Sequence, residues 1–316
     1  MFQFHRRRAC ALIAGAALVF SAAPAPAAAQ SYPGYTTSRY VTLGGDDAAA
    51  ARTAGCAEGE TGRSGPRILF FGTQEKGGKL RHPGTSKGSS TERAASQRAA
   101  EAAEAWAAGF TDCAKSGAEA DLALGVNNKS DGGVSGAAAG KAWAKIVDGV
   151  SGTGAVEVVG AFDAEPSWSK PAWARDWVDA YTAASSTRLY AANSADGCPQ
   201  YGSGSTSCSN GWKLGDLHYV ATGASSKIHA VPQIYRTDGI QARQWAAISA
   251  WGADSGKGKL RVAGSMSQRI ACNQRGGCTG TNNTAKAAWT QLRDELNAHS
   301  ETAIGDLRYA TDMRWP

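Results

Sequence analysis

The 316-residue sequence contains no long apolar run after its first 29 residues, and this absence excludes a later membrane-spanning helix. It has no Cys-x-x-Cys pair and its five histidines are dispersed, so a zinc site built on the cysteines is not expected. The phosphate-binding pattern Gly-x-x-x-x-Gly-Lys-Ser/Thr and the zinc-protease pattern His-Glu-x-x-His are both missing. We therefore expect the protein to work without a metal ion or another cofactor.

The sequence also lacks a strong excess of charge of one sign. Its formal net charge is +6, and it falls to +3 without the first 29 residues, which hold three arginines and no acidic residue. The remaining basic residues are scattered along the chain. This mild charge does not indicate a nucleic-acid partner. We expect a monomer that binds neither nucleic acid nor, after processing, a membrane.

Residues 1–29 have the composition of a cleavable bacterial signal peptide. Three arginines at 6–8 precede an apolar run at 9–23, and three alanines at 27–29 precede Gln30. The apolar run is shorter than the ~20 residues that a membrane-spanning helix needs. We therefore expect export by the general or the twin-arginine route. The mature protein is then secreted and works in the extracellular space.

Removal of this segment leaves six cysteines, an even number that is typical of disulfide-bonded exported proteins. Two pairs are close in sequence and enclose loops rich in Gly, Ser and Asn. This spacing favours Cys198–Cys208 and Cys272–Cys278, and elimination then pairs Cys56 with Cys113.

The chain after residue 66 alternates between short apolar runs and stretches of helical composition. The strand-like runs are 67–73, 121–127, 156–162, 188–193, 217–222, 230–235, 260–266 and 307–313. Residues 30–66 show little periodicity, and we expect an irregular lead-in there, with a short extended piece at 39–43. Residues 67–316 would then form one domain.

Strands that alternate with helices indicate parallel βαβ units, and eight such units predict a (β/α)8 TIM-like barrel. The weak points of this prediction are the short connection between 222 and 230 and Pro232 inside a candidate strand. An open doubly wound sheet is the alternative.

In such barrels the active site lies at the carboxyl ends of the strands. Several predicted strands end in or carry amide, carboxyl and phenol side chains, which suit the hydroxyl groups of a sugar. We predict a substrate-binding role for a set of eight residues. They are Asn127, Trp168, Tyr190, Asn193, Gln233, Tyr235, Gln268 and Asp312.

The segment 156–168, Val-Glu-Val-Val-Gly-Ala-Phe-Asp-Ala-Glu-Pro-Ser-Trp, carries the most specific signal. An apolar strand runs directly into Asp163 and Glu165, whose i, i+2 spacing puts both carboxylates on one face of an extended chain. Neighbouring carboxylates repel, so one can hold its proton as an acid while the other stays ionised. Glycoside hydrolysis needs this division of labour. Trp168 could present a ring face to a sugar, and Trp173 and Trp212 are further candidates for stacking.

This segment resembles secreted glycoside hydrolases of the family-25 lysozyme and family-18 chitinase type, which combine a (β/α)8 barrel with a strand that ends in Asp-x-Glu. The resemblance implies that Glu165 is the general acid and Asp163 its partner, and that the substrate is a polysaccharide such as cell-wall glycan. The sequence departs from these families at two places. Ala161 stands where the chitinase pattern has an aspartate, and the strand at 67–73 leads into Thr73 and Gln74 without the lysozyme aspartate. A carbohydrate-binding or cell-surface protein without catalytic activity is therefore the alternative function.

Overall fold

A computed structural model describes residues 30–316, and residues Tyr32–Pro316 form a single compact unit. The predicted signal peptide, residues 1–29, lies outside the described residues. Within the described part of the chain, no helix is both long and apolar enough to cross a bilayer.

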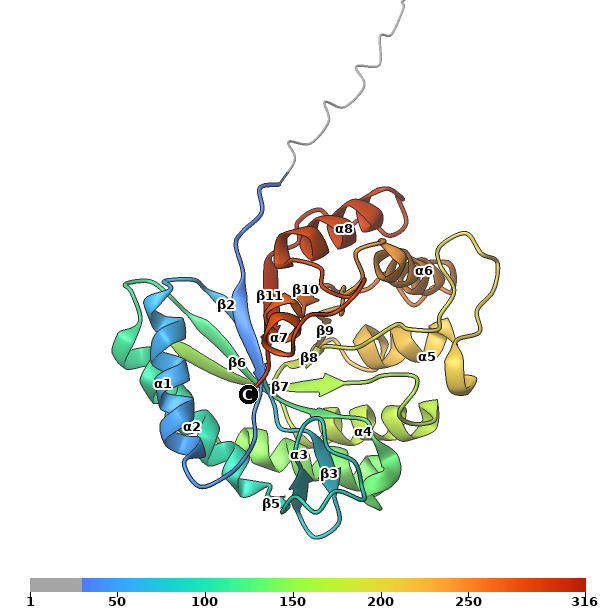
Figure 1. Cartoon of the computed structure of the whole chain (residues 1–316). Coiled ribbons are helices and arrows are strands. Elements are labelled where there is room, and N and C mark those ends of the chain that lie inside the picture. The colour runs from blue at the N-terminus through green and yellow to red at the C-terminus, as the bar shows by residue number, and fades with distance from the viewer. Residues whose placement is uncertain (1–29) are drawn as a thin grey trace, which may run out of the picture. The chain divides into compact units, whose positions relative to one another are not determined.

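Eight parallel strands form the central sheet, in the order β10-β11-β1-β2-β6-β7-β8-β9. The strands are β1 (Thr36–Tyr40), β2 (Gly65–Phe70), β6 (Ala120–Asn127), β7 (Val156–Asp163), β8 (Leu189–Ala191), β9 (Ile228–Ala230), β10 (Gly264–Ser267) and β11 (Tyr309–Arg314). The sheet is nearly closed into a barrel, and helices surround it (Figure 1). The predicted TIM-like barrel is thereby confirmed over the open doubly wound sheet.

The helices alternate with these strands along the chain. They are α1 (Asp47–Glu60), α2 (Gln97–Cys113), α3 (Gly136–Asp148), α4 (Pro171–Ala184), α5 (Leu214–His218), α6 (Ile240–Asp254), α7 (Arg269–Gln274) and α8 (Ala285–Asn297). A small antiparallel sheet of β3 (Thr73–Glu75), β4 (Lys79–Arg81) and β5 (Ala94–Ala95) is inserted between β2 and α2.

Side chains alternate between the barrel interior and the layer of helices, as the two-residue period of a strand requires. On β7, Val159 and Ala161 belong to the interior cluster of apolar side chains, whereas Phe162 stacks on Trp177 of α4 with ring centroids 4.0 Å apart. Asp163 follows in the inward series at the carboxyl end of the strand. The pattern of β7 therefore directs this carboxylate into the mouth of the barrel.

The barrel closes least completely between β9 and β10. Only two isolated pairings, Ala230–Val262 and Gln233–Met266, join the two segments. Pro232 lies between them and has no N–H to donate, although its carbonyl accepts a hydrogen bond from the Met266 N–H at 2.8 Å. The predicted strand at 230–235 is consequently shorter in the structure and shifted towards Ile228.

Two predictions about the strands were wrong. One predicted strand is helical and one observed strand was not predicted, so the number of barrel strands is still eight. Residues 217–222 are helical, in α5 and the π-helical turn that follows it (Tyr219–Gly223). Their β-branched and aromatic composition suggested a strand, but Leu217, Val220 and Ala221 are buried at helical spacing, and tertiary packing overrides such propensities.

The missing strand lies in the segment expected to be an irregular lead-in, residues 30–66. This segment contains β1 and α1, which are the first βα unit of the barrel. β1 pairs with both β2 and β11, so the barrel domain begins before residue 67. A strand of five residues with polar side chains at 36–39 gives little apolar periodicity, which explains the wrong boundary.

Helix α1 packs on α2 through glycines that permit very close backbone approach. A Cβ atom at Gly55 would lie 2.0 Å from the Trp106 carbonyl oxygen, and one at Gly109 would lie 2.0 Å from the Arg52 carbonyl oxygen. The disulfide Cys56–Cys113 joins the same two helices. The two helix backbones are therefore so close that neither glycine position has room for a side chain.

We expect Gly55→Ala and Gly109→Ala each to lower the free energy of unfolding by about 1–3 kcal/mol, because an added methyl group forces the helices apart. Urea denaturation monitored by circular dichroism measures the change. Gly44→Ala is the matched control, because no atom lies within 4 Å of a Cβ at that position. Equal midpoints for Gly55→Ala and the control would contradict this account of the helix pair.

Candidate functional site

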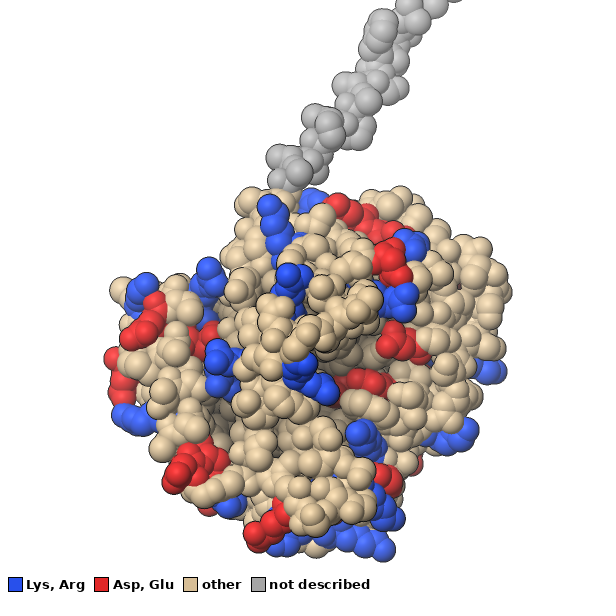
Figure 2. Space-filling view, in the orientation of Figure 1, with Lys and Arg blue, Asp and Glu red and all other residues tan. Residues whose placement is uncertain are grey.

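A pocket of about 180 Å³ opens at the carboxyl ends of the strands. Its walls come from the ends of β1, β2, β6 and β7, from the β4–β5 loop, and from the segments that follow α7 and β11. Asn127, Asp163 and Trp168 of the predicted site line it together. In Figure 2 the face that carries the C-terminus is hollowed, with basic and acidic side chains close together around the hollow.

Asp163 is the acidic group inside the pocket and is only 3% exposed. Its Oδ1 accepts a hydrogen bond of 2.8 Å from the Gln233 side-chain amide, which also donates to the Ala192 carbonyl at 2.9 Å. Burial raises the pKa of Asp163 to about 7, and the Gln233 hydrogen bond and the charge of Lys129 oppose this rise only in part. The carboxyl group therefore holds a proton at a pH where an exposed aspartate is ionised.

Glu165 follows two residues later and is partly buried. Burial raises its pKa well above the usual range, and the charges of Asp163 and Asp196 raise it further. Gln233 lies near Glu165 as well and partly offsets this rise, but its side-chain amide donates to Asp163 and to the Ala192 carbonyl. Glu165 is not among the residues that line the pocket itself.

Two buried asparagines from the neighbouring strands fix the chain between these acids. Asn128 accepts a hydrogen bond from the Glu165 N–H at 3.0 Å and donates to the Glu165 carbonyl at 2.9 Å. Asn193 accepts from the Ala164 N–H at 2.9 Å. The backbone of residues 163–165 is thus held from both sides. The Asn193 side-chain nitrogen is buried without a hydrogen-bond partner among residues 30–316.

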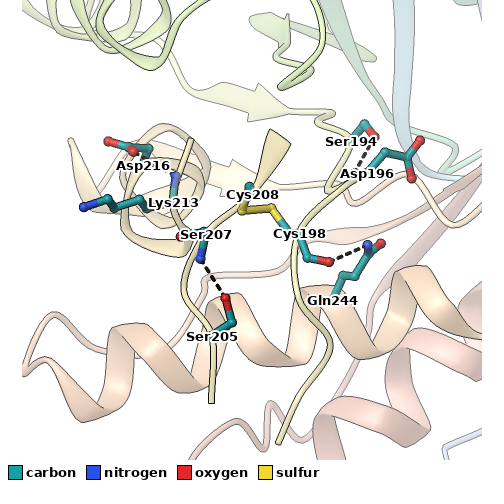
Figure 3. Close-up of a disulfide and its surroundings, with 9 residues drawn as sticks. All are labelled: Ser194, Asp196, Cys198, Ser205, Ser207, Cys208, Lys213, Asp216 and Gln244. Atoms are coloured by element: carbon teal, nitrogen blue, oxygen red, sulfur yellow. Dashed lines mark hydrogen bonds between the residues drawn. A yellow bond between two sulfur atoms is a disulfide. The ribbon is translucent and has the colours of Figure 1, made fainter. Parts of the chain in front are cut away.

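The loop after β8 is anchored beside the acids by the disulfide Cys198–Cys208, and Figure 3 shows Asp196 close to it. Gln244 of α6 donates to the Cys198 carbonyl at 2.8 Å, and Gln241 of the same helix donates to Asp196 at 2.9 Å. These contacts fix the carboxylate whose charge raises the pKa of Glu165. All three disulfides in the structure have the predicted pairing, including Cys56–Cys113 and Cys272–Cys278.

Aromatic side chains complete the site. Tyr40 lies at the end of β1, with its ring centroid 5.0 Å from that of Trp315. Burial raises the pKa of Tyr235 well above its usual value, and the neighbouring Tyr40 and Asp163 raise it further. Tyr235 was predicted from the sequence, whereas Tyr40 and Trp315 were not, because residues 30–66 were taken as irregular and Trp315 follows the last strand.

Three residues of the predicted set face other parts of the molecule. Tyr190 lies inside the barrel, but its hydroxyl group pairs with Asp121 at the amino-terminal end of β6, and it accepts from Arg188 at 2.9 Å. The Gln268 amide donates to the Thr281 carbonyl at 3.0 Å. Asp312 accepts from the Ile270 N–H at 3.5 Å, at the start of α7. Periodicity places a side chain on a face but gives neither its direction along the barrel axis nor its partner.

Two tryptophans proposed for sugar stacking are used in packing. Trp212 is fully buried and its indole N–H donates to the Ser169 carbonyl at 2.8 Å. Trp173 donates to the Val134 carbonyl at 3.0 Å. Trp168 is the member of this group that lines the pocket.

The segment Gly84-Thr85-Ser86-Lys87-Gly88 matches the Gly-x-Ser-x-Gly spacing of serine hydrolases. In those enzymes the serine lies on a sharp turn between a strand and a helix. Here Ser86 is exposed in the loop between β4 and β5. The match therefore does not identify a nucleophile.

Among the described residues, no group of three or more His, Cys, Asp or Glu side chains is arranged to hold a metal ion. A scan against protein-family models finds no match for this sequence, and a search of curated proteins finds no significantly similar one. The site therefore has to be interpreted from its own chemistry.

The raised pKa of Asp163 predicts a specific dependence of stability on pH. The folded protein binds this proton more tightly than the unfolded chain, so the contribution to stability is complete below pH ~4 and is lost as the pH rises towards about 7. We expect Asp163→Asn to remove this loss and to stabilise the protein at pH 8 by on the order of 4 kcal/mol relative to wild type. Thermal and urea unfolding between pH 4.5 and 8 measure it.

Asp306→Asn is the control for this comparison, because Asp306 is exposed. Its stability should follow that of the wild type across the pH range. Parallel pH curves for Asp163→Asn and the wild type would show that the Asp163 carboxyl group is not buried in the folded protein.

Proposed function

We propose that the protein is an exported glycoside hydrolase that acts on an extracellular polysaccharide, with Glu165 as general acid and Asp163 as its carboxylate partner. The observation that carries this proposal is the buried Asp163 carboxyl group in the pocket at the mouth of the barrel, held by Gln233, with Glu165 close enough for the Asp163 charge to act on it and with the pKa of both acids raised. A proton held at neutral pH is what protonation of a glycosidic oxygen needs, while the second carboxylate supports the developing positive charge on the sugar.

The lining of the pocket supports a sugar as the ligand. The rings of Tyr40, Trp168 and Trp315 border it and offer apolar faces, and the amide of Asn127 lies beside them. Apolar faces next to a few polar groups fit a pyranose, which has apolar C–H faces and polar edges.

The disulfides support the exported part of the proposal, because such bonds persist in oxidising compartments outside the cytoplasm. The first strand of the barrel, β1, ends in Tyr40 and continues with Val41 and Thr42. The aspartate expected from family-25 lysozymes at the end of the first strand is therefore missing here too. The proposed mechanism relies on the Asp163–Glu165 pair alone.

We expect Glu165→Gln to lower kcat by a factor of about 10²–10⁴, since the amide cannot donate a proton to the leaving group. Release of reducing ends from peptidoglycan, chitin, and α- and β-glucans measures the activity. Glu101→Gln, an equivalent change on the exposed face of α2, should leave activity unchanged.

Undiminished activity of Glu165→Gln would remove this residue from the mechanism. Binding of a glycan by the wild type, with no cleavage of any of these substrates, would instead favour a carbohydrate-binding protein without catalytic activity.

A further inference from the structure

Two basic side chains reach the pocket from loops that are distant in the sequence. Lys129 follows β6, and Arg275 follows α7 inside the loop closed by the disulfide Cys272–Cys278. Each lies over an aromatic ring of the same pocket. The Lys129 ammonium nitrogen is 4.7 Å from the ring centroid of Trp168, and the Arg275 guanidinium carbon is 4.6 Å from that of Trp315.

Neither cation forms an ion pair within residues 30–316. Other basic residues in this part of the molecule do form ion pairs. Arg81 binds Asp131, and Arg93 binds Glu75 with an N–O distance of 3.1 Å. Lys129 and Arg275 thus keep their donors free towards the pocket, while the rings beneath them hold the charges in place.

Asp163 in the pocket and Glu165 beside it do not cancel these charges. The Lys129 charge acts on Asp163 and Glu165, yet burial still leaves the pKa of both carboxyl groups raised. A protonated carboxyl group carries no charge, so the pocket presents two cations and a partly neutral acid pair at neutral pH. Such a lining attracts an anion and disfavours a cation.

We propose that this pocket binds a polysaccharide whose rings carry carboxylate groups, with Lys129 and Arg275 as the groups that bind them. The proposal rests on the proposed function, of which it names the substrate class. Trp168 and Trp315 then hold the two cations in position, and Lys129 and Arg275 bind the carboxylates of the sugar rings that enter the pocket. The shared chemistry is a carboxylate on a pyranose, either as a uronic acid or as an acidic ether substituent on the ring.

Binding of polygalacturonate by isothermal titration calorimetry tests the proposal, with fully methyl-esterified polygalacturonate as the uncharged control ligand. We expect the free acid to bind at least about tenfold more tightly than the ester, and its affinity to fall as NaCl increases. Lys129→Gln and Arg275→Gln should each weaken binding of the free acid about tenfold and leave binding of the ester unchanged.

Lys141→Gln and Arg308→Gln are matched controls on exposed parts of α3 and of the segment before β11, and they should bind like the wild type. Circular dichroism melting curves establish that each variant is folded. Lys129→Arg should restore most of the binding lost in Lys129→Gln, since it restores the charge.

Peptidoglycan fragments in the same assay distinguish the two sources of carboxylate. Tight binding of these fragments with weak binding of polygalacturonate would assign the site to a carboxylate on an ether substituent. Equal affinity for the free acid and the ester, or no effect of either variant, would overturn the proposal even if neutral glycans are cleaved. Charge-dependent binding without cleavage would instead leave the anion site intact and contradict the hydrolase.

Discussion

The ladder between β6 and β7 is the constraint on which the candidate site depends. It pairs residues from Ala120–Val156 to Asn127–Asp163, and it ends at the mouth of the barrel. Asn128, which directly follows β6, accepts a hydrogen bond from the Glu165 N–H and donates one to the Glu165 carbonyl. A shift of β7 by one residue would turn Asp163 towards the helices and Phe162 into the barrel. Burial of the apolar residues in both strands sets this register, so the core also determines the position of the acids.

Charged side chains at the mouth are arranged differently from those elsewhere in the barrel. The fully buried Arg67 forms an ion pair of 3.1 Å with Glu58 and donates to the Gly65 carbonyl, which satisfies its charge within the protein. Asp163 has one amide donor and no ion pair, and Lys129 has only a tryptophan ring beneath it. Unpaired groups of this kind lower stability, and their presence at one pocket is typical of sites that bind or transform a ligand.

The sequence predicted the barrel and the place of Asp163 at its mouth, because both depend on local patterns: strands alternating with helices, and an apolar run that ends in an acid. It did not predict Tyr40, because five residues with four polar side chains carry no clear strand signal. Arg275 was missed for another reason. A short disulfide loop after α7 brings it to residues more than a hundred positions earlier, and no local pattern records that contact. For Tyr190, the prediction that its side chain faces the barrel interior was correct. The side chain points to the amino-terminal end of the barrel, however, and not to the mouth.

The weakly closed seam between β9 and β10 has a consequence for the acids. Gln233, which donates to Asp163, comes directly after Pro232 in this seam and is one of only two positions where the segments pair. The protonation of the candidate acid is therefore linked to a seam that is joined by isolated pairings and not by a continuous ladder. When the seam opens, Asp163 loses the Gln233 donor but is also exposed to water. Because burial is the largest cause of its raised pKa, opening lowers that pKa and favours release of the proton. Local opening of the barrel wall and protonation of Asp163 are therefore linked equilibria.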